Sequence, residues 1–356
     1  MFVGLGGGYR TKQPPFKALI SRMKSGGIGY SGGYAPASVL ASSRLHPFDS
    51  APIEAANGLC RLLESSGVAF TGLSVGLPYS LETLPQLARV AAGHRLRVIG
   101  FDGPLPERLA PKPSRKRDPY LASPDDPEER LAAINQCEKS LDALAALGGS
   151  CLALELGRPP LQPLDEQTLR TGHERGELTD EWQPVARRFQ KAKEDRFRLS
   201  PRWRDGARFA LDRLVRKAEA RGITLALRFG GSLWQFPSPR EAAQLCADMT
   251  GSAVRIAFDS GAWSRLQALG LTAGEERRKA LLANTALVFA HDACGLEGTL
   301  AAGLGTAPFD WLSDVPETAE VVLCGQTDTT ADEIARAARI IETGLSLRTK
   351  DASASA

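Results

Sequence analysis

The sequence has few of the features that mark a specialised class of protein. Its six cysteines are scattered, with no Cys-x-x-Cys pair, which excludes a zinc-ribbon or dithiol redox spacing. Lys and Arg number 44 against 41 Asp and Glu, a formal charge of +3, so the basic excess of a nucleic-acid-binding protein is absent. No apolar run approaches the roughly 20 residues of a membrane span. We therefore expect neither nucleic acid nor membrane as a partner.

The two ends of the chain show no clear helical or strand period. Residues 1–25 have too many glycines and too short an apolar run for a signal peptide, and we interpret them as a loosely ordered N-terminal extension. Its basic residues leave open an arm that touches a membrane or RNA. Residues 346–356 are expected to be a disordered tail. The thiols are expected to be small buried hydrophobes in a reducing cytoplasm. The sequence leaves the oligomeric state open.

Between residues 26 and 345, short apolar runs alternate with longer helical patterns. Strands buried on both faces read as continuous apolar runs, which is typical of a parallel sheet. An eightfold β/α alternation in one α/β chain of this length predicts a single (β/α)8 TIM barrel. An open doubly wound sheet is the alternative. The predicted strands are 26–33, 68–76, 95–103, 150–157, 223–231, 253–261, 285–293 and 319–326.

Two long segments interrupt this alternation. Residues 104–125 are rich in Pro and basic residues, and residues 158–203 are highly charged with one helical pattern near 180–195. Both follow predicted strands, so in a barrel both would be long loops on the C-terminal rim, where active-site loops are built. The alternative is a pair of solvated insertions with no part in chemistry.

Polar residues at the predicted strand ends are the candidate site, because a closed sheet brings strand ends from distant parts of the chain to one mouth. The candidates for acid–base chemistry are Asp259, His291 and Glu155. The candidates for substrate binding are Arg228, Asp102, Asp292, Gln326 and Trp234.

Arg228 ends an otherwise apolar strand and is the most informative of these residues. A buried guanidinium needs carboxylates or an anionic ligand around it, so Arg228 is either an anion clamp or an internal ion-pair partner of Glu155 or Asp259. Glu155, Asp259 and His291 together offer three metal-ligand types. The positive charge of Arg228 works against a cation at the same mouth, so no cofactor is predicted and a divalent metal remains the alternative.

Four segments resemble the YecE-like family of TIM barrels, a domain of unknown function. They are 29–36, 70–101, 140–161 and 227–234, and the closing segment 321–342 is compatible with that family's last strand and helix. The polar positions of the family pattern differ: Arg228 stands for an acid and Gly230-Gly231 for an Arg-His pair. The resemblance implies a barrel and leaves the activity undefined.

Four segments of the second half also resemble the xylose-isomerase-like sugar isomerase and epimerase barrels. They read "GITLALRFGG", "RIAFDSGAW", "LVFAHDA" and "GLGTAPFDWL". Of the four metal ligands that the resemblance implies, only Asp259 is kept: Arg228 replaces a Glu and Phe289 a His, and no Glu lies near Cys324.

The sequence therefore predicts a TIM barrel that binds a small anionic metabolite, a sugar phosphate or a carboxylate, at the C-terminal mouth. Two alternatives stay open. One is a catalytically silent binding or scaffold barrel, and the other is a metal-dependent sugar isomerase or epimerase with a rebuilt ligand set. The sequence does not decide whether the protein is an enzyme.

Overall fold

The computed structural model describes most of one compact unit of the chain, which spans residues 34–356. The strand predicted at 26–33, the extension 1–25 and Gln326 lie outside the described residues, and the predicted domain boundaries stay predictions. The described residues are 38–41, 52–76, 79–108, 120–161, 164, 166–272, 274–324 and 329–354.

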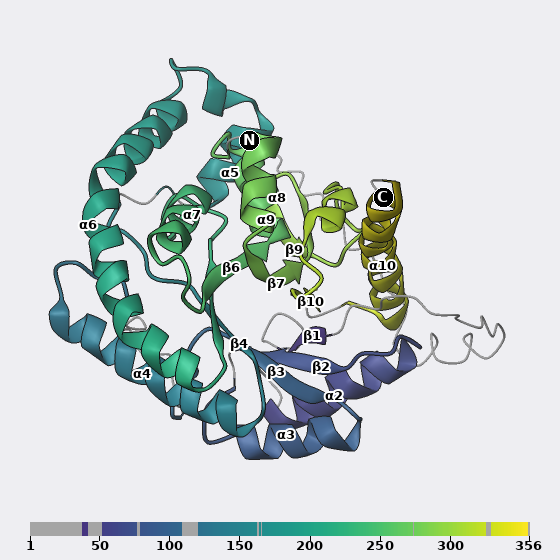
Figure 1. Ribbon diagram of the computed structural model, residues 1–356. Coiled ribbons are helices and arrows are strands. Elements are labelled where there is room, and N and C mark those ends of the chain that lie inside the picture. Colours follow the sequence, from purple (N-terminus) through teal and green to yellow (C-terminus); the bar gives the residue numbers. More distant parts are fainter. Residues whose placement is uncertain are drawn as a thin grey trace, which may run out of the picture. The chain divides into compact units, whose positions relative to one another are not determined.

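Eight parallel strands close into a barrel in the order β1-β10-β7-β6-β5-β4-β3-β2 (Figure 1). The predicted TIM barrel is therefore confirmed and the open sheet is excluded. Seven predicted strands coincide with observed ones, whereas the first strand of the barrel is β1, at 38–41 rather than 26–33. The strands are β1 (Ser38–Ala41), β2 (Gly72–Val75), β3 (Arg97–Asp102), β4 (Cys151–Leu154), β5 (Thr224–Arg228), β6 (Val254–Asp259), β7 (Thr285–Ala290) and β10 (Glu320–Leu323).

Helices between the strands form the outer layer, and most of them cover apolar side chains on the outward face of the sheet, whereas α5 packs against α6. Proline and capping residues begin several of them: Asp126 accepts a hydrogen bond from the Glu129 N–H at the start of α4, and Ser238 and Glu241 form a capping box at the start of α7. The helices are α2 (Pro52–Ser65), α3 (Leu84–Gly93), α4 (Pro127–Ala146), α5 (Glu166–Glu174), α6 (Pro184–Ala220), α7 (Pro239–Asp248), α8 (Ser260–Ala268), α9 (Glu275–Leu282) and α10 (Ala331–Ala354).

The interior of the barrel is narrow and built mainly from small side chains. Because side chains alternate across a strand, the inward positions of β5 and β6 are Ala226 and Ala257, and the next inward positions are Arg228 and Asp259. Phe289 on β7 is the one aromatic side chain of this interior cluster. Small neighbours leave room for its ring, and the polar layer lies above it at the C-terminal ends of the strands.

The helical pattern predicted near 180–195 within the segment 158–203 is confirmed as the start of α6, but the rest of the segment is more helical than a long loop. It contains α5, the short helix η1 (Glu177–Thr179) and the first half of α6, which continues to Ala220 with Pro201 inside it. The 37-residue α6 tolerates the lost backbone donor of Pro201 because buried side chains recur on both sides of it, from Val185 to Ala218. In Figure 1, α6 runs down the left side of the view, with α7 on its inner side and α4 beside its lower half.

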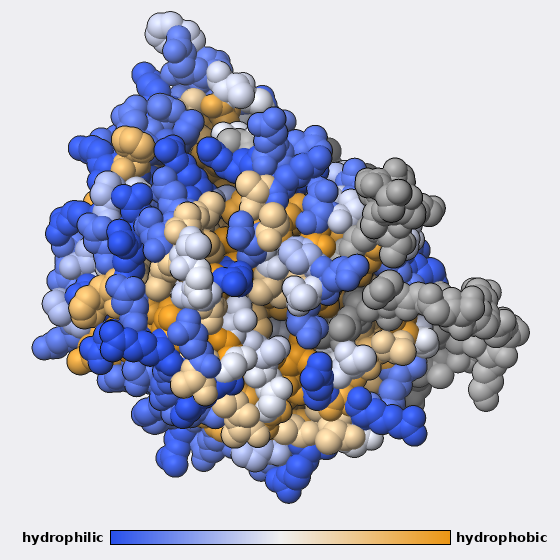
Figure 2. Space-filling view, in the orientation of Figure 1, coloured by the Kyte–Doolittle hydropathy of each residue, from blue (hydrophilic) through white to orange (hydrophobic). Residues whose placement is uncertain are grey.

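Three further elements differ from the sequence interpretation. The helix α8 begins directly at the end of β6, and the antiparallel hairpin of β8 (Asp292–Cys294) and β9 (Glu297–Leu300) follows β7. The last helix, α10, continues past residue 345 to Ala354. Figure 2 shows hydrophilic side chains over much of the outer helices, with apolar side chains between them nearer the middle of this face. Among the described helices, none has the length and apolar character that a membrane crossing requires.

Candidate functional site

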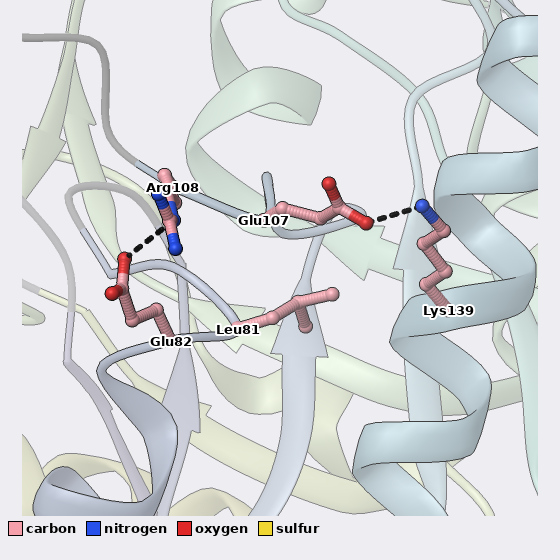
Figure 3. A pocket seen from close by; sticks show the side chains of 5 residues that line it. All are labelled: Leu81, Glu82, Glu107, Arg108 and Lys139. Carbon is pink, nitrogen blue, oxygen red and sulfur yellow. Dashed lines mark hydrogen bonds and ion pairs between the residues drawn. The ribbon is translucent and has the colours of Figure 1, made fainter.

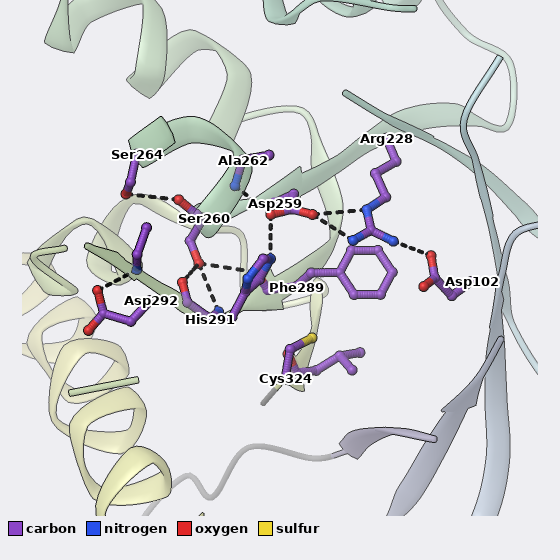
Figure 4. Close-up of polar contacts among 12 residues, drawn as sticks. Asp102, Arg228, Asp259, Ser260, Ala262, Ser264, Phe289, His291, Asp292 and Cys324 are labelled. Carbon is purple, nitrogen blue, oxygen red and sulfur yellow. Dashed lines mark hydrogen bonds and ion pairs between the residues drawn. The ribbon is translucent and has the colours of Figure 1, made fainter. Parts of the chain in front are cut away.

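The guanidinium of Arg228 lies between two aspartates at the C-terminal end of the barrel (Figure 4). Its Nε and Nη2 donate to Asp259 Oδ2, at 3.0 and 2.6 Å, and its Nη1 donates to Asp102 Oδ1. Its Cζ lies 4.2 Å from the centroid of the Phe289 ring, within cation–π distance. Burial alone would lower the pKa of Arg228, but the charges and hydrogen bonds of Asp102 and Asp259 raise it overall. Arg228 is therefore a fixed cation.

Asp259 is buried and contacts several groups at once. Besides Arg228, it accepts the N–H of Ala262 at Oδ1, at 2.8 Å, and thereby caps the N-terminus of α8. The same Oδ1 makes an ion-pair contact with His291 Nε2. The predicted ion pair of Arg228 with Asp259 is present, and the same carboxylate caps α8, so it is committed to the fold of the mouth.

His291 follows β7 and is 2% exposed. Its backbone N–H donates to Ser260 Oγ at 2.9 Å, which ties the end of β7 to the start of α8. Its Nδ1 has no hydrogen-bond partner among the described residues and faces Gly261, where an added Cβ would come within 2.4 Å of that nitrogen. Only glycine at position 261 leaves room for the imidazole beside Asp259.

A cavity of about 300 Å³ opens above this cluster. Glu155 lines it and is exposed. It accepts a hydrogen bond from Gln235 Nε2 at 3.1 Å and lies 3.7 Å from Arg158 Nε. Arg228 therefore pairs with Asp102 rather than with Glu155. The lining residues are Glu155, Arg158, Arg228, Phe229, Gly230, Gly231, Ser232, Gln235, Asp259, Gly261, Ala262, Arg265 and His291.

The other predicted substrate-binding residues lie elsewhere. Asp292 is buried, and its carboxylate accepts four backbone N–H groups, which fixes the chain from 303 to 307 beside β8. Trp234 packs on a side cluster around Leu269 and does not line the cavity. Gln326 is outside the described residues. The sequence analysis did not identify Arg158, Gln235 and Arg265, because none of them ends a strand. Arg158 could have been found, because it directly follows the predicted strand 150–157 that contains Glu155.

A shallow surface depression elsewhere on the molecule does not bring unpaired polar side chains together (Figure 3). It is lined by Leu81, Glu82, Glu107, Arg108 and Lys139. Its charges pair with one another: Arg108 Nε lies 3.3 Å from Glu82 Oε2, and Lys139 donates to Glu107. Exposed ion pairs of this kind contribute little and mark no ligand site.

Four of the six thiols follow the expected buried pattern. Burial raises the pKa of Cys60 to about 11 and that of Cys151 to about 12, which keeps both protonated. Cys137 and Cys324 are also buried, whereas Cys294 on β8 is exposed. No described cysteine is in a disulfide, and none lines the cavity of the mouth.

The donor groups of the mouth do not fit a metal ion. Asp102, Asp259 and His291 are metal-ligand types, but the guanidinium of Arg228 lies among them and occupies both carboxylates. A divalent cation at this point would face a fixed positive charge and a carboxylate that already caps a helix. Within the described part of the chain, no three His, Cys, Asp or Glu side chains have an arrangement that could hold a metal.

Comparison with known proteins identifies the fold. No family model matches the chain, so the YecE-like resemblance finds no support, and no curated protein matches it either. An L-ribulose 3-epimerase structure matches with a TM-score of 0.59 at 12% identity, covering 91% of this chain and 98% of that chain. The apo form of 3-keto-D-glucoside 4-epimerase YcjR from E. coli matches at 0.54 and 14% identity, covering 86% and 99%. The IolI protein with a bound zinc atom matches at 0.55 and 13%, covering 88% and 98%. The resemblance to sugar isomerase and epimerase barrels is thus confirmed for the fold.

Proposed function

We propose that the cavity at the C-terminal mouth binds a small anionic sugar, a sugar acid or sugar phosphate, and that the protein acts on it as a metal-independent isomerase or epimerase. The observation that supports this most is the cavity lining, in which three arginines meet two carboxylates in a space of about 300 Å³. That volume is at the small end of ligand pockets and suits a monosaccharide. The fold is also that of sugar epimerases such as L-ribulose 3-epimerase.

Glu155 is the group in this proposal that moves a proton. Asp259 and His291 contact each other, and Asp259 also holds Arg228 and α8, whereas Glu155 faces the cavity with a neutral amide and an exposed arginine beside it. Its carboxylate removes the proton on the carbon next to a sugar carbonyl and returns one to form the isomer or epimer. Arg228 donates its remaining N–H groups to the enediolate oxygen that develops.

Solvent exchange tests this proposal without knowledge of the product. Sugar acids and sugar phosphates are first screened by thermal shift, since a ligand at 100 times its Kd stabilises the fold by roughly 2.7 kcal/mol. Each hit is then incubated with the protein in D2O, and we expect deuterium at one carbon next to the carbonyl by NMR. Glu155→Gln should keep binding and lose the exchange, and EDTA should leave the exchange unchanged. Exchange that survives Glu155→Gln would remove Glu155 from this role.

A catalytically silent binding barrel is the second candidate. It is favoured by the internal commitment of Asp259 and His291, the two predicted acid–base residues that are buried. Under this alternative the same ligands bind, Arg158→Gln weakens them, and no deuterium enters at any carbon.

A further inference from the structure

A second cavity of about 510 Å³ lies next to the mouth, between the middle of α6, the start of α7 and the loop that follows β5. It shares Gly230, Ser232 and Gln235 with the cavity of the mouth. The Gln235 side chain lies against Gly230, where an added Cβ would come within 2.1 Å of it, and its amide donates to Glu155. One side chain thus forms part of the wall between the two cavities, and the two cavities adjoin each other at this side chain.

The charged groups of the second cavity are unbalanced. Four cations line it against one carboxylate, Glu241, and that carboxylate is taken up by Arg196 in two hydrogen bonds, one of them 2.8 Å long. Glu241 also accepts from Ser200 and from the backbone of Ser238, so its acceptor positions are filled from within the fold. This leaves Lys193, Arg204 and Arg240 without a carboxylate within 4 Å in the described part of the chain.

One of these three cations has a donor that the fold leaves unused. Arg204 donates from Nη1 to Gln244 Oε1 at 3.1 Å, but its Nε is buried and has no hydrogen-bond partner among the described residues. No carboxylate of the described residues neutralises the guanidinium of Arg204, and its N–H groups that line the cavity can donate to an anionic ligand. Lys193 Nζ lies 5.9 Å from the Phe189 ring centroid, which orients the ammonium without neutralising it.

We propose that this second cavity binds the phosphoryl group of the ligand whose sugar part lies in the cavity of the mouth. The inference rests on the proposed function and narrows its ligand to a sugar phosphate. A phosphate dianion suits three unpaired cations better than a carboxylate does, and a guanidinium is able to donate two parallel hydrogen bonds to it. The phosphoryl group is then held by α6 and α7, away from the carboxylates that surround Arg228.

Binding of inorganic phosphate, followed by calorimetry and by 31P line width at low and at physiological salt, tests the inference. Removing one charged hydrogen bond weakens binding by about tenfold or more, so Arg204→Gln and Arg240→Gln should each raise the Kd for phosphate by at least that factor. Arg216→Gln, an exposed residue of the same helix α6 outside the cavity, should leave the Kd unchanged. Circular dichroism establishes that each variant is folded, and the exposed Arg240 can be changed without disturbing buried contacts.

The outcomes separate this inference from the function proposed above. Equal weakening by Arg216→Gln, or no phosphate binding at millimolar concentration, would overturn the second cavity as a phosphate site. The phosphate site is also overturned if Arg158→Gln or Arg265→Gln abolishes phosphate binding while Arg204→Gln does not, because the anion would then lie in the mouth. In a further outcome, phosphate binding depends on Arg204 and Arg240, but no sugar phosphate takes up deuterium in D2O. This result would support the second cavity as a phosphate site and would remove only the proposed isomerase activity.

Discussion

Arg196 on α6 and Arg228 at the end of β5 are both guanidiniums that are largely buried, lie over a phenylalanine ring and contact carboxylates. Arg196 faces one carboxylate, Glu241, and its Cζ lies 5.2 Å from the centroid of the Phe236 ring. Arg228 faces two carboxylates, and its Cζ lies 4.2 Å from the Phe289 ring. The first cluster is charge-balanced. The second places one guanidinium against two carboxylates, beside a histidine whose Nδ1 has no hydrogen-bond partner among the described residues.

The difference separates a structural ion pair from a site. The Arg196–Glu241 pair joins α6 to α7, and both carboxylate oxygens of Glu241 accept hydrogen bonds from within the fold. Breaking such a buried ion pair lowers stability, so its role is structural. Around Arg228 the groups come from three strands, and a cavity opens on them. Ionisable groups that converge in a concave place are typical of functional sites, where such an arrangement is retained for chemistry at some cost in stability.

Removing Glu241 is expected to have the largest effect on stability. Glu241→Ala leaves the buried Arg196 uncompensated and should cost about 3–5 kcal/mol in the free energy of unfolding, measured by denaturant titration. The double variant Arg196→Met/Glu241→Leu should recover most of that loss, because an apolar pair of similar volume needs no charge balance. Asp125→Ala breaks the exposed pair with Arg202 and serves as the control, at about 0.2–1 kcal/mol. A loss of only about 0.2–1 kcal/mol for Glu241→Ala would contradict a structural role for the Arg196–Glu241 pair and remove its difference from the Arg228 cluster.

The two aspartates of the mouth should differ from each other. Asp259→Ala removes the hydrogen bonds to Arg228, the cap of α8 and the contact to His291, and should cost about 2–3 kcal/mol. Asp102→Ala leaves Arg228 paired with Asp259 in a balanced pair and should cost about 1 kcal/mol. Both losses are measured in the same denaturant titration. Equal losses would mean that Arg228 needs Asp102 as much as Asp259, whereas Arg196 is balanced by the single carboxylate of Glu241.

Gly261→Ala tests the position of the imidazole. The new Cβ would meet His291 Nδ1 at 2.4 Å, so the ring must move from Asp259, and we expect a loss of about 1–2 kcal/mol together with a changed His291 signal in NMR. Gly93→Ala, at the end of α3, is the control, because nothing lies within 4 Å of its added Cβ. It should be neutral or slightly stabilising. An unchanged imidazole signal in Gly261→Ala would contradict the packing described above.

The pH dependence of stability should show the smallest effect. Burial alone would raise the pKa of Glu241, but the charge of Arg196 and the hydrogen bonds from Arg196, Ser200 and Ser238 lower it below 4.5 overall. A carboxyl group whose pKa is lower in the folded state than in the unfolded state stabilises the fold at pH values above its unfolded-state pKa. This stabilisation is lost as the pH falls through the folded-state pKa. Each unit of lowering contributes about 1.4 kcal/mol. Between pH 5 and 3 the native protein should therefore lose more stability than Glu241→Gln; parallel curves would show that Glu241 is not the group responsible.

Much of the fold and part of the site could be predicted from residue order. The apolar runs and the helical patterns between them predicted seven of the eight strands, because a parallel strand covered on both faces must be apolar. Side chains two residues apart in a strand lie on the same face. Arg228 follows Ala226 by two residues and Asp259 follows Ala257 by two residues, so both lie on the inner face of the barrel. That these side chains meet at one mouth follows from closure of the sheet.

The second partner of Arg228, Asp102, and the course of α6 could not be predicted in this way. Arg228 contacts Asp102 across β4, because that strand contributes the small Ala153 at the intervening position. The helix α6 continues through Pro201 because packing on both sides compensates for one missing hydrogen bond. Asp292 turns to four backbone amides rather than to the cavity.

The sequence alone determined that the chain forms parallel strands with covering helices, and which polar residues end those strands, since both follow from local patterns. The tertiary structure decided which charges meet, which of them are balanced and where the cavities lie. Those choices depend on the volume of side chains in neighbouring strands and on helices packed from distant parts of the chain, and no local pattern encodes either.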